Sequence, residues 1–455
     1  MNRPRVLLIA EAANPEWVSV PLVGWCHSQA IARRTGAHLV TQVRNKEAIE
    51  RTGLREGEDF TAIDSEEVAR WVWRLGNLLR GGSGKGWTTV QALSSLSYYY
   101  FEHLVWKRFG QRIREGSYDV VHRLTPLSPT VPSLLAAKCR AAAVPFVLGP
   151  LNGGIPWPRQ FDRARRKEKE WLSYVRRAYK LLPGSRGTLA NSSAIVVGSA
   201  ATLAQVPRVY RKKCFYIPEN AIDPERFTLR RRTTAQLPLR LLFVGRLVPY
   251  KGADMVIEGA AVGIRNGEID LEIIGDGPQM NDLVALIARE TLQGKVRLSG
   301  WVEHARLQER MADADVFVFP SIREFGGGAV LEAMAVGLVP IVMNYGGPGE
   351  LVTEGTGYLI SMSGRAEIVR QLREVLSHLV SHPEEVDRKS PAAMRRARKQ
   401  FTWEAKAKQM VQVYDWVTKQ RAERPQFAVP TPELGEEYVA DTRSELSESL
   451  VQVVQ

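Results

Sequence analysis

The sequence is poor in cysteine and has no long apolar run. Its three cysteines, Cys26, Cys139 and Cys214, are widely spaced in 455 residues and offer neither a disulfide framework nor a metal-ligand pair. This usage fits a reducing cytoplasm. No stretch approaches the ~20 apolar residues that span a bilayer. The N-terminal run VLLIA is too short for the apolar core of a signal peptide, so we expect a buried strand there.

Several motifs are also missing. No G-x-G-x-x-G follows the first apolar run, where residues 11–15 read EAANP, so a dinucleotide-binding oxidoreductase is not indicated. Helix-turn-helix, RNA-binding strand and zinc-finger spacings are absent as well, which argues against a nucleic-acid partner.

Charge is unevenly distributed. Residues 1–237 contain 37 Lys+Arg against 19 Asp+Glu, a net of +18, whereas the remainder contains 25 against 30, a net of −5. Nine of the basic residues lie between Arg159 and Lys180, among aromatic side chains. Two interpretations stay open for this segment: a solvated basic face, and a helix pair that lies on anionic lipid at the inner face of the membrane.

Short apolar runs alternate with longer amphipathic segments, which is typical of parallel α/β domains. In the first half, the expected strands read VLLIAE, HLVTQV, YDVVHRL, PFVLGP, AIVVGS and CFYIPE. In the second half, they read LRLLFVG, LEIIGDG, VRLSGW, VFVFPS, VPIVMNY and TGYLIS.

Residues 321–352 carry the most informative pattern. Two carboxylates, Glu324 and Glu332, lie eight positions apart around the glycine run Gly326–Gly328. The preceding VFVFP predicts a buried strand, and residues 327–336 predict a helix. A strand, a glycine turn and a helix N-terminus form an anion site, because backbone N–H groups are bare there and the helix dipole favours negative charge. Carboxylates beside such a site bind hydroxyl groups, so the pattern predicts a nucleotide-sugar ligand.

This pattern resembles the Glu-x7-Glu signature of the retaining glycosyltransferases of family 4, and the resemblance covers most of the chain. Further segments resemble the family in the same order: VLGPLNGG (147–154), IPENAIDPERF (217–227), FVGRLVPYKG (243–252), IIGDGP (273–278), ADADVFVFPS (312–321) and FTWEAKAKQMVQVY (401–414). The resemblance implies an α/β architecture, the GT-B fold, in which two facing Rossmann-like domains with parallel sheets enclose a deep interdomain cleft.

The resemblance and the shifts in composition predict five parts. They are an acceptor-side N-terminal domain (1–227), a basic linker (228–239), a C-terminal domain that binds the nucleotide-sugar (240–400), a closing helix that returns toward the N-terminal domain (401–420), and a mostly disordered tail (421–455). An aromatic-rich stretch, residues 70–116, interrupts the first domain. We expect a helical insertion whose aromatic side chains mostly pack in the core; an acceptor wall is the alternative.

The family's site residues carry over to named positions. Arg246 and Lys251 match positions that neutralise the leaving diphosphate, Glu324 one that binds a hydroxyl of the transferred sugar, and Glu332 one that holds the ribose. Further donor-binding candidates are Gly153, Gly154, Gly245, Gly326, Gly327, Gly328 and Glu350. Glu350 alternatively caps the next helix.

The roles of a histidine and of an aspartate pair cannot be carried over directly from the family. Relatives carry a His-x-His-x-Pro-like segment at the end of the strand YDVVH, but here His122 is followed by Leu124 at the second histidine position. A catalytic or substrate-positioning role and a buried structural role therefore both stay open for His122. Asp313 and Asp315 spell D-x-D, for which we expect helix capping and solvation, and no metal.

The resemblance implies a hexosyltransferase that moves a sugar from a nucleoside-diphosphate donor to a saccharide acceptor, with retention of anomeric configuration and without metal or cofactor. A lipid-linked saccharide or a polysaccharide precursor is the expected acceptor, and an anionic membrane surface the expected further partner. The alternatives are a catalytically silent GT-B subunit of a polysaccharide-assembly complex, and a GT-B epimerase or phosphorylase.

Overall fold

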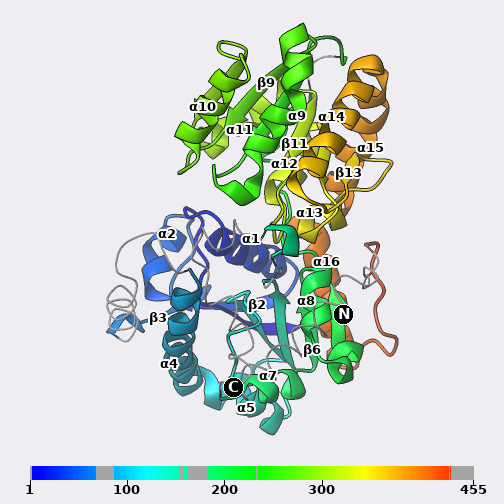
Figure 1. Cartoon of the computed structure of the whole chain (residues 1–455). Helices are drawn as coiled ribbons and strands as arrows, with labels where there is room; N and C mark the ends of the chain where they lie inside the picture. Colours follow the sequence, from blue (N-terminus) through cyan, green and yellow to red (C-terminus); the bar gives the residue numbers. More distant parts are fainter. Residues whose placement is uncertain are drawn as a thin grey trace, which may run out of the picture. The chain divides into compact units, whose positions relative to one another are not determined.

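The computed structural model describes residues 3–67, 87–153, 155, 157–161, 183–231, 234–429 and 431. The chain divides into two compact units (Figure 1). The first comprises Met1–Gly154, Arg165–Glu219 and Trp403–Gln455, and the second comprises Ile155–Ala164 and Asn220–Thr402. The part of the first unit that precedes the second sheet thus ends at Glu219, eight residues before the predicted boundary at residue 227. Gly154 and most of the basic segment between Arg159 and Lys180 lie outside the described residues.

The first unit contains a parallel seven-stranded sheet of order β3-β2-β1-β4-β5-β6-β7. Its strands are β1 (Arg5–Ala10), β2 (Gly36–Gln42), β3 (Phe60–Ile63), β4 (Val120–Thr125), β5 (Phe146–Leu151), β6 (Ala194–Val197) and β7 (Cys214–Tyr216). The central strand β1 pairs with both neighbours in register, so that Val6 lies opposite Ala37 and Val120. Six of these strands coincide with predicted apolar runs. The edge strand β3 (FTAI) was not predicted, because it lies in an acid-rich stretch, GEDFTAIDSEE, that resembles a loop.

Helices connect these strands. They are α1 (Val20–Ala32), α2 (Lys46–Glu50), α4 (Trp87–Arg114), α5 (Leu135–Ala141), α7 (Ser185–Asn191), α8 (Ala200–Gln205) and α16 (Trp403–Val417), with 3-10 turns η1 (Val43–Asn45) and η5 (Arg208–Lys213). Helix α4 confirms the predicted helical insertion. Phe101, Val105 and Phe109 recur at every fourth position and are buried, as core packing requires. Helix α16, the predicted closing helix, belongs to the first unit and packs on α1.

The second unit contains a parallel six-stranded sheet of order β10-β9-β8-β11-β12-β13. Its strands are β8 (Leu239–Val244), β9 (Ile269–Ile274), β10 (Val296–Gly300), β11 (Val316–Phe319), β12 (Val339–Met343) and β13 (Tyr358–Ile360). Its helices are η2 (Arg159–Phe161), η6 (Pro249–Lys251), α9 (Ala253–Asn266), α10 (Met280–Arg289), α11 (His304–Ala312), α12 (Gly328–Val336), α13 (Gly346–Leu351), α14 (Arg365–Ser381) and α15 (Glu384–Gln400). Helix α9 packs with α10 and α14, and α12 packs with α11 and α15.

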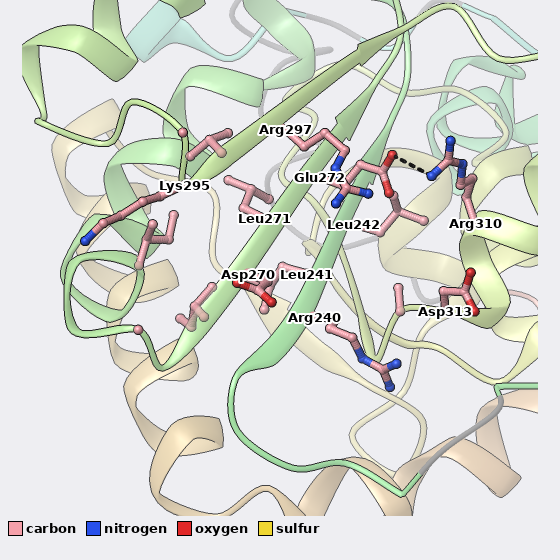
Figure 2. Close-up of a pocket in the computed structure, with 16 residues that line it drawn as sticks. Arg240, Leu241, Leu242, Asp270, Leu271, Glu272, Lys295, Arg297, Arg310 and Asp313 are labelled. Carbon is pink, nitrogen blue, oxygen red and sulfur yellow. Dashed lines mark ion pairs between the residues drawn. The ribbon is translucent and has the colours of Figure 1, made fainter.

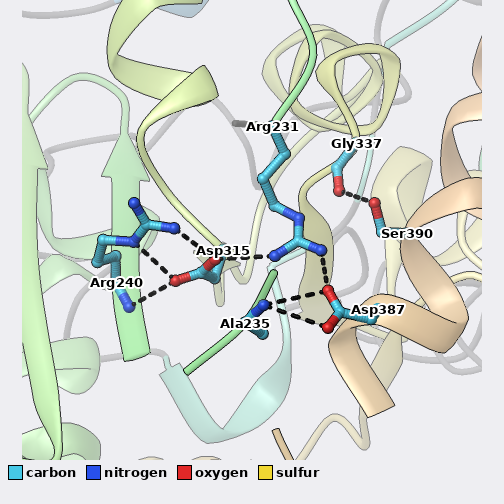
Figure 3. Close-up of polar contacts among 7 residues, drawn as sticks. All are labelled: Arg231, Ala235, Arg240, Asp315, Gly337, Asp387 and Ser390. Carbon is cyan, nitrogen blue, oxygen red and sulfur yellow. Dashed lines mark hydrogen bonds and ion pairs between the residues drawn. The ribbon is translucent and has the colours of Figure 1, made fainter. Parts of the chain in front are cut away.

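The segment predicted as a basic linker is anchored in the second unit (Figure 3). The guanidinium group of Arg231 donates to Asp315 at 2.9 Å and also to Asp387. The backbone N–H of Ala235 donates to both carboxylate oxygens of Asp387 at 3.2 Å. Nearby, the Ser390 hydroxyl donates to the carbonyl oxygen of Gly337 at 2.5 Å, which ties α15 to the end of α12.

The expectation that both aspartates of the D-x-D sequence serve capping and solvation is wrong for Asp315. Its side chain has no exposed surface and accepts hydrogen bonds from Arg231 and Arg240. Arg240 donates through its backbone N–H, its Nε and its Nη2, at 2.8–3.1 Å. Asp313, in contrast, is exposed and is the C-cap residue of α11, as expected. Across the described parts of the chain, no helix is sufficiently long and apolar to cross a membrane.

Candidate functional site

Two loops of the second unit meet where their parallel strands end. β8 and β11 are neighbours, so the loop that follows β8 through η6 lies beside the loop that follows β11. The backbone N–H of Ile322 donates to the carbonyl oxygen of Tyr250 at 2.9 Å. Gly252 has φ +79, and a Cβ there would lie 2.9 Å from the carbonyl oxygen of Pro320. Glycine is therefore required for this close approach of the two loops.

This approach brings together two of the predicted site residues. The ammonium group of Lys251, the last residue of η6, donates to the carboxylate of Glu324. Both side chains keep some exposure, 17% for Lys251 and 18% for Glu324, so a ligand can reach either group. The Lys251 ammonium also lies 5.1 Å from the ring centroid of Phe319, within cation–π range.

The predicted glycine turn and helix are present next to this ion pair. Gly327 is the N-cap residue of α12 and has φ +63, a left-handed conformation that favours glycine. The first hydrogen bonds of the helix are donated by Val330 and Leu331 to the carbonyl oxygen of Gly327, at 3.1 and 3.2 Å. The N–H groups of Gly328 and Ala329 precede them, at the positive end of the helix dipole. The helix start thus has the arrangement on which the predicted anion site depends.

The other donor-binding residues predicted in this unit lie in the loop after β8 and in the helices that follow β11 and β12. Glu332 is half-buried in α12, and Arg246 is exposed in the loop after β8. Gly245 donates its N–H to Ile274 at 3.0 Å, which joins the ends of β8 and β9. Glu350 is the fifth residue of α13, outside the first turn, so the alternative that it caps this helix is wrong.

In the first unit, Gly153 follows β5 at the corresponding edge of the sheet. It has φ +141, and its N–H donates to the side-chain oxygen of Asn152 at 2.9 Å. This φ favours glycine, and the hydrogen bond fixes the conformation of the loop.

The geometry around His122 favours the buried structural alternative. Its side chain has no exposed surface. Nε2 lies 2.6 Å from the carbonyl oxygen of Gly149 and Nδ1 lies 2.6 Å from the hydroxyl of Tyr414, so the network assigns the proton to Nε2. Burial lowers the pKa of His122 to about 4, against the opposing effect of the Gly149 hydrogen bond. The neutral ring thus joins β4 to α16.

A cavity of about 700 Å3 in the second unit lies elsewhere (Figure 2). It is lined by residues where β8, β9 and β10 begin, among them Arg240, Asp270 and Arg297. Glu272 and Arg310 form an ion pair at 3.7 Å within it. Ligands of open α/β sheets bind at the carboxyl ends of the strands, so this cavity is distinct from the candidate site.

Sequence reasoning missed three side chains around the candidate site. Trp157 and Arg323 are buried beside the loops that carry Lys251 and Glu324, and their ring and guanidinium group lie 5.2 Å apart. The Asn220 side chain lies 3.6 Å from the position that a Cβ on Gly328 would take. Contacts over such sequence separations leave no local pattern that could have revealed them.

Two Rossmann-like parallel sheets in one chain define the GT-B fold of glycosyltransferases, and solved structures share it. Sucrose-phosphate synthase of Thermosynechococcus elongatus superposes with a TM-score of 0.58 and 16% identity, over 92% of this chain and 100% of that one. A glycosyltransferase of Rickettsia africae superposes with a TM-score of 0.57 and 14% identity, over 92% and 100% of the two chains.

Residues 226–393 match the family described as glycosyl transferases group 1. Glycogen synthase of Mycobacterium tuberculosis is 31% identical over 217 residues, which are 47% of this chain and 51% of that protein. The amylovoran biosynthesis glycosyltransferase of Erwinia amylovora is 30% identical over 194 residues, 41% of this chain and 44% of that protein. The chain thus spans about half the length of the curated relatives it matches, and these relatives are glycosyltransferases.

Proposed function

We propose that the protein transfers a hexose from a nucleoside-diphosphate donor to a saccharide acceptor, with retention of anomeric configuration and without a metal ion. The observation that carries this proposal is the Lys251–Glu324 ion pair beside the N-terminus of α12, at the carboxyl ends of parallel strands. Such a site offers positive charge to a diphosphate and a carboxylate to sugar hydroxyl groups.

Each group has a defined part in the proposed reaction. When the diphosphate binds, the Lys251 ammonium turns from Glu324 to the phosphate oxygens, and the freed carboxylate accepts from a sugar hydroxyl. Arg246 adds a forked cation, and Glu332 holds the ribose hydroxyls. The N–H groups of the glycine turn complete the stabilisation of the charge that develops on the leaving group.

The proposed acceptor is a lipid-linked saccharide or a polysaccharide precursor. Support comes from the matched relatives, whose names include a glycogen synthase and an amylovoran biosynthesis glycosyltransferase. Both names belong to polysaccharide synthesis.

We expect a nucleoside diphosphate to stabilise the protein even in the presence of EDTA. A ligand at one hundred times its Kd stabilises the folded state by about 2.7 kcal/mol, which is visible as a raised Tm. Uridine, guanosine and adenosine diphosphates are compared by thermal shift, first with EDTA and then with magnesium or manganese. A shift that appears only with the metal contradicts metal independence, and the absence of any shift contradicts the proposed donor.

We also propose that the first unit adheres to anionic membranes. The outward face of α4 is basic, with Lys107, Arg108, Arg112 and Arg114 all exposed. The cations of Arg114 and Lys138 each lie over the Trp106 ring, at 5.4 and 5.1 Å from its centroid. Basic side chains beside an aromatic ring are typical of helices that lie on anionic lipid. The basic segment 159–180 adds to the same charge.

The protein should sediment with vesicles of anionic lipid, and the binding should fall steeply with salt because the attraction decays within a Debye length. Each basic side chain near the surface contributes roughly 1 kcal/mol, so Lys107→Gln with Arg108→Gln should weaken binding about 30-fold. The matched control removes two exposed cations of the second unit, Arg289→Gln with Arg297→Gln. Equal binding to neutral vesicles, or an equal loss of binding in the control, would contradict membrane binding by α4 and leave its basic residues as a solvated face.

A further inference from the structure

A short segment from the first half of the chain belongs to the second unit. Ile155–Ala164 is assigned there, although Met1–Gly154 before it belongs to the first unit. Within its described part, the side chain of Ile155 has no exposed surface and that of Trp157 is 6% exposed. A Cβ on Gly346 would lie 2.7 Å from Cδ1 of Ile155, so the segment fits tightly against the start of α13.

The Trp157 indole contacts one residue from each loop of the candidate site. Its ring meets the Tyr250 ring edge to face, with centroids 5.9 Å apart and planes at 86°. The guanidinium carbon of Arg323 lies over the same indole at 5.2 Å. Both arrangements are the favourable ones for these groups, because the aromatic face is negative and attracts ring edges and cations.

The two residues that Trp157 contacts directly precede the ion pair. Tyr250 is followed by Lys251, and Arg323 is followed by Glu324. The carbonyl oxygen of Tyr250 accepts from the N–H of Ile322 at 2.9 Å, so the loops are also joined through their backbones. The Arg323 guanidinium carbon also lies over the Phe325 ring, at 5.5 Å from its centroid. Trp157 thus fixes both neighbours of the paired charges.

The contacts of Trp157 distinguish it from a residue that only fills the core, because both are made with residues adjacent to the paired charges. Many other buried side chains of the second unit, such as Phe243, Phe317 and Leu331, lie on its strands and helices. Trp157 instead comes from a segment outside the sheet, and its contacts with Tyr250 and Arg323 are made in the loops at the carboxyl edge of the sheet.

We propose that Trp157 is a positioning residue of the donor site, acting through Tyr250 and Arg323 on the Lys251–Glu324 pair. This inference rests on the proposed function. The ammonium and the carboxylate can pass from each other to a bound diphosphate-sugar only when the two loops that carry them are held in place before the ligand arrives, since loop displacements near 1 Å forfeit much of the gain. Without the indole, the two loops lose their common support and the ammonium and carboxylate groups lose their alignment.

The test measures binding of the nucleoside diphosphate that gives the largest thermal shift. Trp157→Leu should weaken this binding about tenfold and Trp157→Phe about threefold, because a single phenyl ring retains part of both contacts. The matched control is Trp301→Leu, since Trp301 is 74% exposed on the loop after β10. Its binding should stay within about twofold of the wild type. Circular dichroism and Tm establish that each variant is folded. If Trp157→Leu does not fold, the binding measured for Trp157→Phe tests the inference.

A double-mutant cycle separates positioning from a merely structural role. In a Lys251→Met background, Trp157→Leu should weaken binding by less than about twofold, because the group it positions has been removed. If Trp157→Leu costs the same factor in both backgrounds, or binds as the wild type does, the inference is overturned. If the wild type binds none of the three nucleoside diphosphates, the proposed function fails, and the role of Trp157 fails with it. The control variant keeps these outcomes distinguishable from a general loss of stability.

Discussion

Glu332→Ala and Arg246→Ala variants should each lose measurable sugar transfer while remaining folded. Each substitution removes a charged contact to the donor, which we expect to cost about 2–4 kcal/mol of transition-state stabilisation, a loss of roughly 30- to 1,000-fold in rate. Arg246 is exposed and Glu332 only half-buried, so truncation leaves the core intact. The measurement is the initial rate of transfer from the nucleotide-sugar whose diphosphate binds best, at saturating and subsaturating donor.

The matched control for Arg246→Ala is Arg297→Ala. Arg297 is an exposed arginine of the same unit, but it lies in β10 and lines the cavity at the other edge of the sheet. Its removal should leave the rate within about twofold of the wild type. Turnover at the wild-type rate in a folded Glu332→Ala or Arg246→Ala variant would remove that residue from the site. Equal losses in Arg297→Ala would point to a general electrostatic effect.

The fold could be predicted because its information is local. A buried parallel strand is a short apolar run, and all six strands of the second unit coincide with segments predicted as strands, although β10 (VRLSG) has no buried residue. The helix expected at residues 327–336 begins at Gly328 and ends at Val336, since glycines flank it at both ends. The exception, β3, is a four-residue strand at the sheet edge, and it lies in an acid-rich stretch, GEDFTAIDSEE, that resembles a loop.

Part of the candidate site could also be predicted from short sequence segments. Lys251 and Glu324 each follow a strand directly, and neighbouring parallel strands bring such loops together. Their direct ion pair was not predicted, because it depends on the close approach of Gly252 to Pro320. The support from Trp157 could not be predicted either, since the indole contacts loops from a different part of the chain.

Buried polar residues were the least predictable, because their partners are distant in sequence. His122 bonds to Tyr414, 292 positions away, and the pattern around it gives no sign of this partner. Asp315 lies 84 positions from Arg231 and 75 from Arg240. An aspartate in a D-x-D sequence and an arginine in a basic run both suggest exposed residues when read singly. Only the fold shows that they neutralise each other.

Asp315→Ala should destabilise the second unit strongly. The substitution removes the carboxylate that two guanidinium groups share, and the Arg231 side chain is only 9% exposed. Removing one partner of a buried ion pair costs about 3–5 kcal/mol, and we expect the lower end of this range because Arg231 keeps its ion pair with Asp387. The free energy of unfolding is measured on the full chain with a chemical denaturant, with the transition of the second unit followed by its loss of nucleotide binding. Asp315→Asn, which retains the shape but not the charge, should lie between the wild type and alanine.

The control for this experiment lies two positions away in the same D-x-D sequence. Asp313→Ala removes the same charge from an exposed C-cap position and should change the free energy of unfolding by about 0.5 kcal/mol or less. Similar effects of the two substitutions would contradict the buried network. If the two aspartates instead bound a metal together, both alanine variants would abolish transfer in a metal-dependent manner. The network predicts the opposite separation: Asp315 governs the stability of the second unit, and Asp313 is dispensable for both stability and transfer.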